Sequence, residues 1–388
     1  MLNSFVIRSK NSTELNNLNS SPESMHRPKR VLIDLDRLRE PTSGLGHVAL
    51  YFGERLAQRA PSLRDMRFTF LVPKHDVGRF GNNVEYVAES RFLKVFPVLH
   101  QRYDLWYCPH QDIAYPPSGA AKFIFTINDL NFLKEKSPAR CRARLRRIQK
   151  FVDRSSALTV ISENTAAEVR ENLKVEQRPP HVLPFGLELK TFASANQPSF
   201  VPQRPYLLTV GVHKHTKNYR ALVAFMEQVP EYDLVMLGNN QTPAGIELKE
   251  QLQKSSARER VHLLGICSEE DKFWFYKNCA AVLFPSISEG MGYPPLEAMQ
   301  ARRPSFVFRE SAVPEICGPH ALYWSSQDPQ TMAHELREGI QFFNTHPEYV
   351  EAAYAHGMSF GWDPVVEKYI ELFRQVLAEE SSSSSAHT

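Results

Sequence analysis

Short apolar runs alternate with longer amphipathic segments along most of the chain. In the first half the apolar runs, which are rich in residues typical of β-strands, cover 31–35, 68–72, 123–127 and 158–161. Helical periodicity follows the first run at 48–59 and the last run from Glu163 onward. This alternation predicts an α/β architecture with parallel sheets.

The same alternation resumes after a polar stretch at 196–205, whose three prolines indicate a domain linker. The apolar runs of the second half are 206–210, 232–237, 261–264, 281–284 and 305–308. A chain of 388 residues also exceeds the usual size of a single hydrophobic core. We therefore predict two Rossmann-like domains, 29–195 and 205–361, that face a central cleft and bind ligands beyond the carboxyl ends of their strands.

Composition and charge exclude several classes of protein. A formal charge of +3 is too mild for a nucleic-acid-binding protein, so we expect no nucleic-acid partner. The five cysteines are scattered and form no C-x-x-C pair, which argues against a disulfide framework or a structural zinc site. Residues 1–28 and 379–388 are polar and aperiodic, and we expect both to be disordered tails. Because no signal peptide or long apolar stretch is present, we expect a cytoplasmic protein.

The strongest candidate for chemistry is Glu289-Gly-Met-Gly-Tyr-Pro-Pro-Leu-Glu297, which follows the apolar run at 281–284. Gly290 and Gly292 allow close approach of the backbone, and the prolines indicate a helix start whose amides favour an anion. The two glutamates accept hydrogen bonds from hydroxyl groups. An isolated two-glycine loop is usually a plain strand-to-helix turn with Glu297 on a solvated face. The combination nevertheless matches the needs of a sugar diphosphate.

This segment resembles the E-x7-E signature of the retaining family 4 glycosyltransferases, from whose commonest form only Met291 and Tyr293 differ. The resemblance extends over about residues 30–375. Its further landmarks are 34–47, 126–130, 160–163, 183–186, 209–218, 264–266 and 313–318. The resemblance implies the GT-B fold, in which the second domain binds most of the donor and a last helix at 362–378 crosses back onto the first domain.

The resemblance also implies roles for individual donor-site residues. Glu289 is expected to bind hydroxyls of the donor sugar, Glu297 to bind the ribose, and Lys217 to stabilise the departing diphosphate. The family usually has an arginine just before this lysine, where the present chain has Thr216. The nearby residues that could replace its charge are His213, Lys214 and His215. Further donor contacts are expected at Ile266, which belongs to a base-contacting turn, and at Gly290, Met291, Gly292 and Tyr293.

In the first domain the resemblance places Gly46 near the donor phosphate, and His47 and Asp129 near the acceptor. His110, in Trp106-Tyr-Cys-Pro-His110, resembles the family histidine that lies against the transferred sugar. Plainer interpretations remain, in which His47 lies on a mobile loop, His110 is structural and Asp129 caps a helix. The residues predicted to be catalytic are Glu289, Lys217 and His110.

Two further segments carry suggestive patterns. Asp34-Leu-Asp36 resembles a metal-binding D-x-D, but it ends the first strand and this fold class normally dispenses with a catalytic metal. We therefore predict no metal ligand and no cofactor besides the nucleotide sugar. Residues 140–150 form a strongly basic helix, which either contacts anionic lipid or a phosphate-bearing acceptor, or is simply a solvated face.

The predicted function is transfer of a hexose, with retention of configuration, from a nucleoside diphosphate sugar to a glycan or lipid-linked acceptor. The family pattern favours GDP-mannose or a GDP-deoxyhexose as donor, and synthesis of lipopolysaccharide, capsule or exopolysaccharide as the setting. The departing phosphate is expected to take the acceptor proton. A double displacement with Glu289 as nucleophile is the alternative chemistry.

Two other classes of protein compete with this prediction. A non-catalytic binding protein is suggested by Thr216 and by Asn128, which takes the place of a histidine usual in related transferases. An NAD-type oxidoreductase is suggested by the G-x-G-x-x-A pattern at 44–49. That pattern lies about nine residues past the preceding strand, instead of directly after it, and 68–72 leads into Pro73-Lys-His without the acidic residue that binds ribose.

Overall fold

The structure is a computed structural model that describes residues 27–41, 43–90, 103–117, 120–189 and 197–379. The tails predicted to be disordered lie outside the described residues, apart from 27–28 and 379. Residue 196, where the predicted linker begins, lies outside them too.

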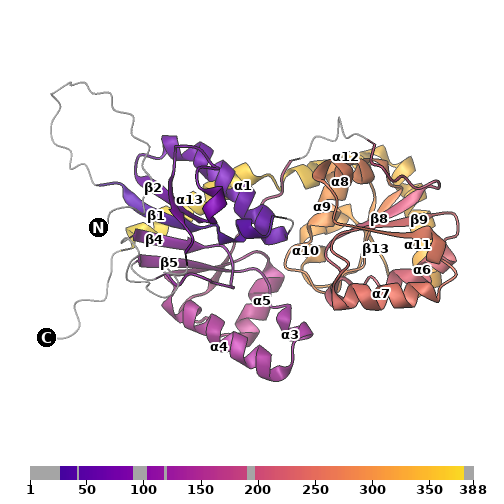
Figure 1. Ribbon diagram of the computed structural model, residues 1–388, viewed down its shortest axis with the longest axis horizontal. Coiled ribbons are helices and arrows are strands. Elements are labelled where there is room, and N and C mark those ends of the chain that lie inside the picture. Colours follow the sequence, from indigo (N-terminus) through magenta and orange to yellow (C-terminus); the bar gives the residue numbers. More distant parts are fainter. Residues whose placement is uncertain (1–26, 42, 91–102, 118–119, 190–196, 380–388) are drawn as a thin grey trace.

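The first domain is built on a parallel sheet of seven strands in the order β3-β2-β1-β4-β5-β6-β7 (Figure 1). Its strands are β1 (Lys29–Asp34), β2 (Met66–Val72), β3 (Glu85–Ala88), β4 (Tyr103–Cys108), β5 (Ala120–Ile127), β6 (Ala157–Val160) and β7 (Pro180–Val182). Its helices are α1 (Gly44–Arg59), α3 (Phe132–Glu135), α4 (Pro138–Arg154) and α5 (Glu163–Asn172).

The second domain has a parallel sheet of six strands in the order β10-β9-β8-β11-β12-β13. Its strands are β8 (Tyr206–Val210), β9 (Asp233–Leu237), β10 (Val261–Gly265), β11 (Ala281–Phe284), β12 (Ser305–Val307) and β13 (Leu322–Tyr323). Its helices are α6 (Ala221–Gln228), α7 (Pro243–Gln253), α8 (Glu269–Asn278), α9 (Tyr293–Gln300), α10 (Val313–Cys317), α11 (Pro329–Thr345) and α12 (Pro347–Met358).

Both faces of the first sheet are covered, which explains the nearly continuous apolar runs. On β1, Val31 and Ile33 belong to the core beside α1, while Leu32 belongs to the core on the opposite face. A strand that is buried on both faces needs apolar residues at successive positions and shows no simple alternation. The two-domain α/β fold predicted from the sequence is confirmed.

The last helix, α13 (Trp362–Ala378), returns to the first domain, where it lies beside α1 (Figure 1). The ring of Phe52 on α1 packs against Tyr369 with 5.4 Å between centroids, and against Trp362 with 6.2 Å. The amide of Leu187 donates to the carbonyl of Phe360 at 2.6 Å. The chain therefore crosses between the domains twice, at neighbouring places.

In each sheet the strand order reverses at one point, between β1 and β4 in the first domain and between β8 and β11 in the second. Open parallel sheets bind ligands beyond the carboxyl ends of the strands at such switch points. Among the described residues, no helix combines the length and the apolar character needed to cross a bilayer.

Candidate active site

The loop that follows β11 opens a helix with uncovered amides. Gly292 has a left-handed φ of 91° and precedes α9, whose first turn contains Pro294 and Pro295. No side chain caps this helix start. The first amides of an uncapped helix attract anions through their hydrogens and through the helix dipole. The segment that carries the predicted signature thus forms a candidate diphosphate site.

Lys217 and Glu289 meet at the switch point of the second sheet. Lys217 ends the short 3-10 helix His215–Lys217 after β8, and its Nζ lies 2.5 Å from Oε1 of Glu289. The same carboxylate accepts a hydrogen bond from the hydroxyl of Ser286, and the lysine lies over the ring of Phe284 at 4.9 Å. Both charged side chains are mostly buried, with 17% and 12% exposed. The cation and the first acidic residue of the signature therefore form one unit.

Thr216, which replaces the family's arginine, supports this unit through its backbone. Its carbonyl accepts hydrogen bonds from the amide of Ile287 and the hydroxyl of Ser286, both at 2.9 Å. Its side chain points the other way, with Oγ1 3.5 Å from Oε1 of Glu135 in the first domain. Thr216 thus fixes the loop that holds Glu289 and brings no charge to the site.

Glu297, the second acidic residue of the signature, is buried on the first turns of α9. The hydroxyl of Tyr276 donates to its Oε2 at 2.6 Å, and Nζ of Lys272 lies 3.7 Å from its Oε1. Burial raises the pKa of Tyr276 well above its usual range, and the charge of Glu297 is the second largest cause of this rise. Sequence reasoning missed both partners. They lie four residues apart on α8, and a lysine on the same helix face as Phe275 and Tyr276 was the available signal.

His213 lies beside the diphosphate loop as a neutral ring. Its side chain is buried, its two ring nitrogens have no hydrogen-bond partner, and it packs edge-on against Tyr219 at 5.0 Å. Burial, with a smaller contribution from the charge of Lys249, lowers the pKa of His213 to about 4. A ring that is neutral at pH 7 cannot replace the charge of an arginine. Lys214 and His215 line a cavity of about 170 Å³ together with His213.

Asp129 in the first domain is electrostatically linked to this site. Burial raises the pKa of Asp129 above its ordinary value. The hydrogen bond from the amide of Asn131 and the charge of Lys214 act in the opposite direction, and the charge of Glu289 raises the pKa further. That hydrogen bond, at 3.0 Å, forms a turn just before α3. Asp129 thus shapes the turn before α3 and lies within the field of the donor site, and its contact with the acceptor stays a prediction.

The two domains touch at the donor loop. A Cβ atom added to Gly290 would lie 2.2 Å from the carbonyl oxygen of Asn128. The hydroxyl of Ser288 donates to Asn131 at 2.6 Å and accepts a hydrogen bond from Lys134 at 3.0 Å. Gly290 is therefore required by close packing of the domains around the loop.

A second cavity, of about 50 Å³, is lined by residues of both domains and includes Glu297. His47 and Tyr51 of α1 line it from the first domain, and Glu297 and Tyr293 line it from the second. The predicted acceptor residue His47 and two predicted donor residues therefore share one space.

Two of the remaining predicted residues lie differently from the expectation, and one lies as expected. The amide of Gly46 donates to the hydroxyl of Ser43 at 3.0 Å, so it caps α1 and is not directed at a phosphate. The side chain of Met291 is buried in the core, which leaves only its backbone for a ligand. Ile266, in contrast, is 59% exposed just beyond β10, as expected for a residue that contacts a flat base.

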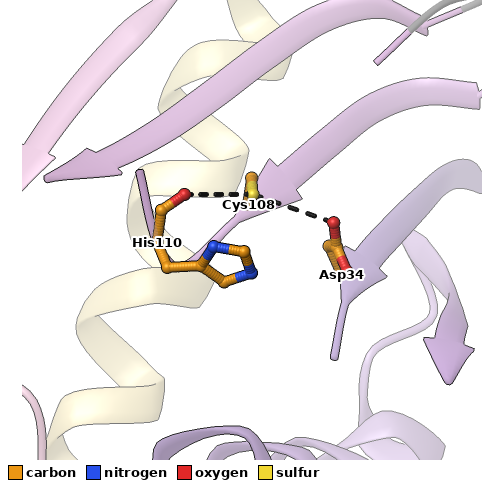
Figure 2. Close-up of side chains that lie close together, drawn as sticks. All are labelled: Asp34, Cys108 and His110. Carbon is orange, nitrogen blue, oxygen red and sulfur yellow. Dashed lines mark hydrogen bonds between the residues drawn. The ribbon is translucent and has the colours of Figure 1, made fainter. Parts of the chain in front are cut away.

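His110 is buried within the first domain. Its Nε2 lies 2.9 Å from Oδ1 of Asp36, and Asp36 is also bonded to Arg39 at 2.7 Å. Figure 2 shows Cys108 between the carbonyl oxygen of His110 and the carboxylate of Asp34. The ring is 1% exposed, and its hydrogen bond is to Asp36 instead of to Lys217 or Glu289. The structure therefore brings two of the three predicted catalytic residues together and places the third in a separate cluster.

The comparisons with known proteins agree with this geometry. Residues 192–355 match the family of glycosyl transferases group 1. O-antigen chain mannosyltransferase B of Escherichia coli is 19% identical over 89% of this chain and 99% of its own length. The serotype-specific mannosyltransferase WbdA of Escherichia coli is 24% identical over 47% of this chain. The alignment spans only 23% of that longer relative.

Solved structures show the same fold. Sucrose-phosphate synthase from Thermosynechococcus elongatus has a TM-score of 0.68 at 18% identity, and covers 90% of this chain and 99% of its own. Anabaena HepE in complex with UDP and glucose has a TM-score of 0.69 at 16% identity, over 90% and 100% of the two chains. The predicted GT-B fold and glycosyltransferase resemblance are thus confirmed. The chain thus has the GT-B fold, and most of its second domain matches the glycosyl transferases group 1.

Proposed function

We propose that this chain transfers a hexose from a nucleoside diphosphate sugar to a hydroxyl group of a glycan or lipid-linked acceptor during synthesis of a surface polysaccharide. The observation that carries the proposal is the Lys217–Glu289 pair beside the uncapped start of α9. This arrangement offers a cation and free amides to a diphosphate, and a carboxylate to sugar hydroxyls. The relatives named as O-antigen and serotype-specific mannosyltransferases support the setting.

The geometry supports a separate role for each of these groups in the reaction. The diphosphate lies on the α9 amides next to Lys217, which stabilises the charge that grows on the leaving oxygen. Glu289 binds hydroxyls of the sugar, and Glu297, held by Tyr276, binds the ribose. As the bond from the anomeric carbon to the phosphate oxygen breaks, its electron pair passes to that oxygen. The acceptor oxygen bonds to the same face of the sugar, and its proton moves to the departing phosphate.

Retention by this front-face route needs no protein nucleophile. Oε1 of Glu289 already interacts with Lys217 and with Ser286, which favours a binding role over nucleophilic attack. Lys217 and the amides supply the positive charge that the leaving diphosphate needs, so we propose transfer without a catalytic metal. Turnover that does not depend on added Mg²⁺ or Mn²⁺ is the expected result.

The donor is proposed to be GDP-mannose or a GDP-deoxyhexose. The support is the names of the relatives, which are mannosyltransferases, and the exposed Ile266 as a surface for the base. A panel of GDP-, UDP-, ADP- and dTDP-linked sugars, compared by thermal shift and by release of nucleoside diphosphate, tests this choice. A larger shift with a UDP-linked sugar than with every GDP-linked sugar would overturn it.

Variants at the central pair test the site. Lys217→Ala is expected to lower kcat by about 10²–10³-fold, the effect of losing one group that stabilises developing charge. Glu289→Ala is expected to abolish measurable transfer. Lys254→Ala and Glu310→Ala, at exposed positions of the same domain, are the matched controls. Donor binding without turnover in the wild-type protein would instead identify a non-catalytic binding protein.

The basic helix α4 is proposed to hold the enzyme at the inner face of a membrane. Arg144 and Arg147 bond to Asp112 and to the carbonyl of Ile113, so part of the charge is used within the domain. The basic residues left exposed along 140–150 besides Arg147 are Arg140, Arg142, Arg146 and Lys150. Each charge near an anionic surface contributes about 1 kcal/mol to binding. Cosedimentation with phosphatidylglycerol vesicles, but not with phosphatidylcholine vesicles, is expected, and alanines at the four exposed positions should abolish it.

A further inference from the structure

Two short motifs lie side by side at the switch point of the first sheet. Asp34 and Asp36 are separated by one residue at the end of β1, and Cys108 and His110 are separated by one residue at the end of β4. The strands are parallel neighbours with Ile33 opposite Tyr107. Asp34 and Cys108 come next in this register, so their side chains leave the same face of the sheet. The sulfur of Cys108 lies 3.8 Å from Oδ2 of Asp34.

His110 is the third member of the group, and a hydrogen bond to Asp36 orients its ring. Its Nε2 bonds to Asp36, whose other oxygen accepts a hydrogen bond from Arg39. Its Nδ1 is buried without a hydrogen-bond partner. A histidine that binds a metal through one ring nitrogen normally donates from the other nitrogen to a carboxylate or carbonyl. Asp36 provides such a partner and leaves Nδ1 available.

We propose that Asp34, Cys108 and His110 form a binding site for Zn²⁺. One ligand atom of each residue lies within 4.8 Å of the others (Figure 2). The three residues are 0%, 0% and 1% exposed. Sulfur, imidazole nitrogen and carboxylate oxygen form the mixed donor set that zinc accepts in tetrahedral sites. The fourth position is left for a water molecule.

This site is structural and separate from the donor site. The ion joins the ends of β1 and β4 to the segment after Cys108, which carries His110 and Gln111. Gln111 bonds to the amide of Asn128 and the carbonyl of Asp129, so the ion stabilises the part of the first domain that faces the donor loop. The inference does not rest on the proposed function, because the ligands and the Lys217–Glu289 pair belong to different domains.

Metal analysis of the full-length protein tests the proposal. Protein without an affinity tag, produced with zinc in the medium, is expected to retain about one zinc ion per chain after gel filtration. Protein stripped with a chelator and titrated with Co²⁺ is expected to show a thiolate-to-cobalt charge-transfer band in the near ultraviolet. Absence of both the zinc and the band from the wild-type protein would overturn the site.

Variants locate the ion. Cys108→Ser is expected to remove the cobalt band and the retained zinc, whereas Cys141→Ser, at another buried thiol of the same domain, should keep both. Asp36→Asn, which alters the residue behind His110, is expected to weaken zinc binding about 10- to 100-fold. If Cys108→Ser does not fold, the wild-type band and its survival in Cys141→Ser still decide the question. Zinc that persists in folded Cys108→Ser places the ion elsewhere and contradicts the proposal.

Discussion

At the scale of single residues, Glu297 depends on a partner outside the signature. The hydroxyl of Tyr276 donates to this buried carboxylate at 2.6 Å. Tyr276→Phe leaves the carboxylate oxygen without its donor, which costs about 1–3 kcal/mol. We expect the free energy of urea unfolding to fall by this amount and the KM for the donor to rise. Tyr232→Phe, at a half-buried ring of the same domain, is the control, and equal stability of the two variants would contradict the assignment.

His213 makes stability depend on pH. Burial lowers its pKa to about 4 in the folded protein, whereas the unfolded chain has the ordinary value of 6.5. The unfolded state therefore binds more protons between these values, so stability is complete above pH 6.5 and is lost as pH falls toward 4. At pH 5 the loss from this group is about 2 kcal/mol.

Urea unfolding at pH 7 and pH 5 checks this prediction. His213→Asn removes the group, so the decrease in stability between the two pH values should be about 2 kcal/mol smaller than in the wild-type protein. His334→Asn, at an exposed position on α11, should keep the wild-type decrease. A decrease in His213→Asn that equals the wild-type decrease would show that His213 does not titrate in this way.

The sequence located the two signature carboxylates and Lys217 but not their environment. The spacing of glycines, prolines and glutamates is local, so it predicts a loop and a helix start. Tyr276 and Lys272 reach Glu297 from α8, whose place beside α9 follows from the order of the strands. His110 was expected at the sugar because it resembles the family histidine at that place, but a histidine after a strand can face either the cleft or the core. Burial decides between the two, and no local pattern in this chain encodes it.

At the scale of elements, α13 is part of the core of the first domain although it comes last in the chain. Phe373 is fully buried, with its ring 5.4 Å from that of Tyr107 on β4. Phe373→Ala is expected to cost about 3–5 kcal/mol in the free energy of unfolding, because it removes a large core ring. Phe342→Ala on α11, where the ring is 37% exposed, should cost much less in the same urea experiment. Equal costs would show that α13 is not integral to this core.

Most strands could be predicted, whereas three short edge strands could not. The runs at 31–35 and 281–284 became β1 and β11 because strands covered on both faces need continuous apolar sequence. β3, β7 and β13 were not predicted, since they have two to four residues each and pair on one side only. Short, partly exposed strands carry too little apolar pattern to be distinguished from loops.

At the scale of the whole molecule, the donor loop is shaped by contact between the domains. Ser288 is bonded to Asn131 and Lys134, and the carboxylate of Glu315 accepts hydrogen bonds from the first amides of α5 at 2.8 and 3.1 Å. The conformation in which the loop holds Glu289 therefore coincides with a close approach of the two domains.

Gly290→Ala tests whether this approach matters for transfer. The added Cβ would lie 2.2 Å from the carbonyl oxygen of Asn128, a distance that forces backbone to move. We expect the domains to separate, so that the radius of gyration from small-angle scattering rises and kcat falls at least tenfold, while urea unfolding changes little. Gly44→Ala, whose Cβ would meet no atom within 4 Å, should change neither quantity. Full activity in Gly290→Ala would mean that the donor loop works without the first domain packed against it.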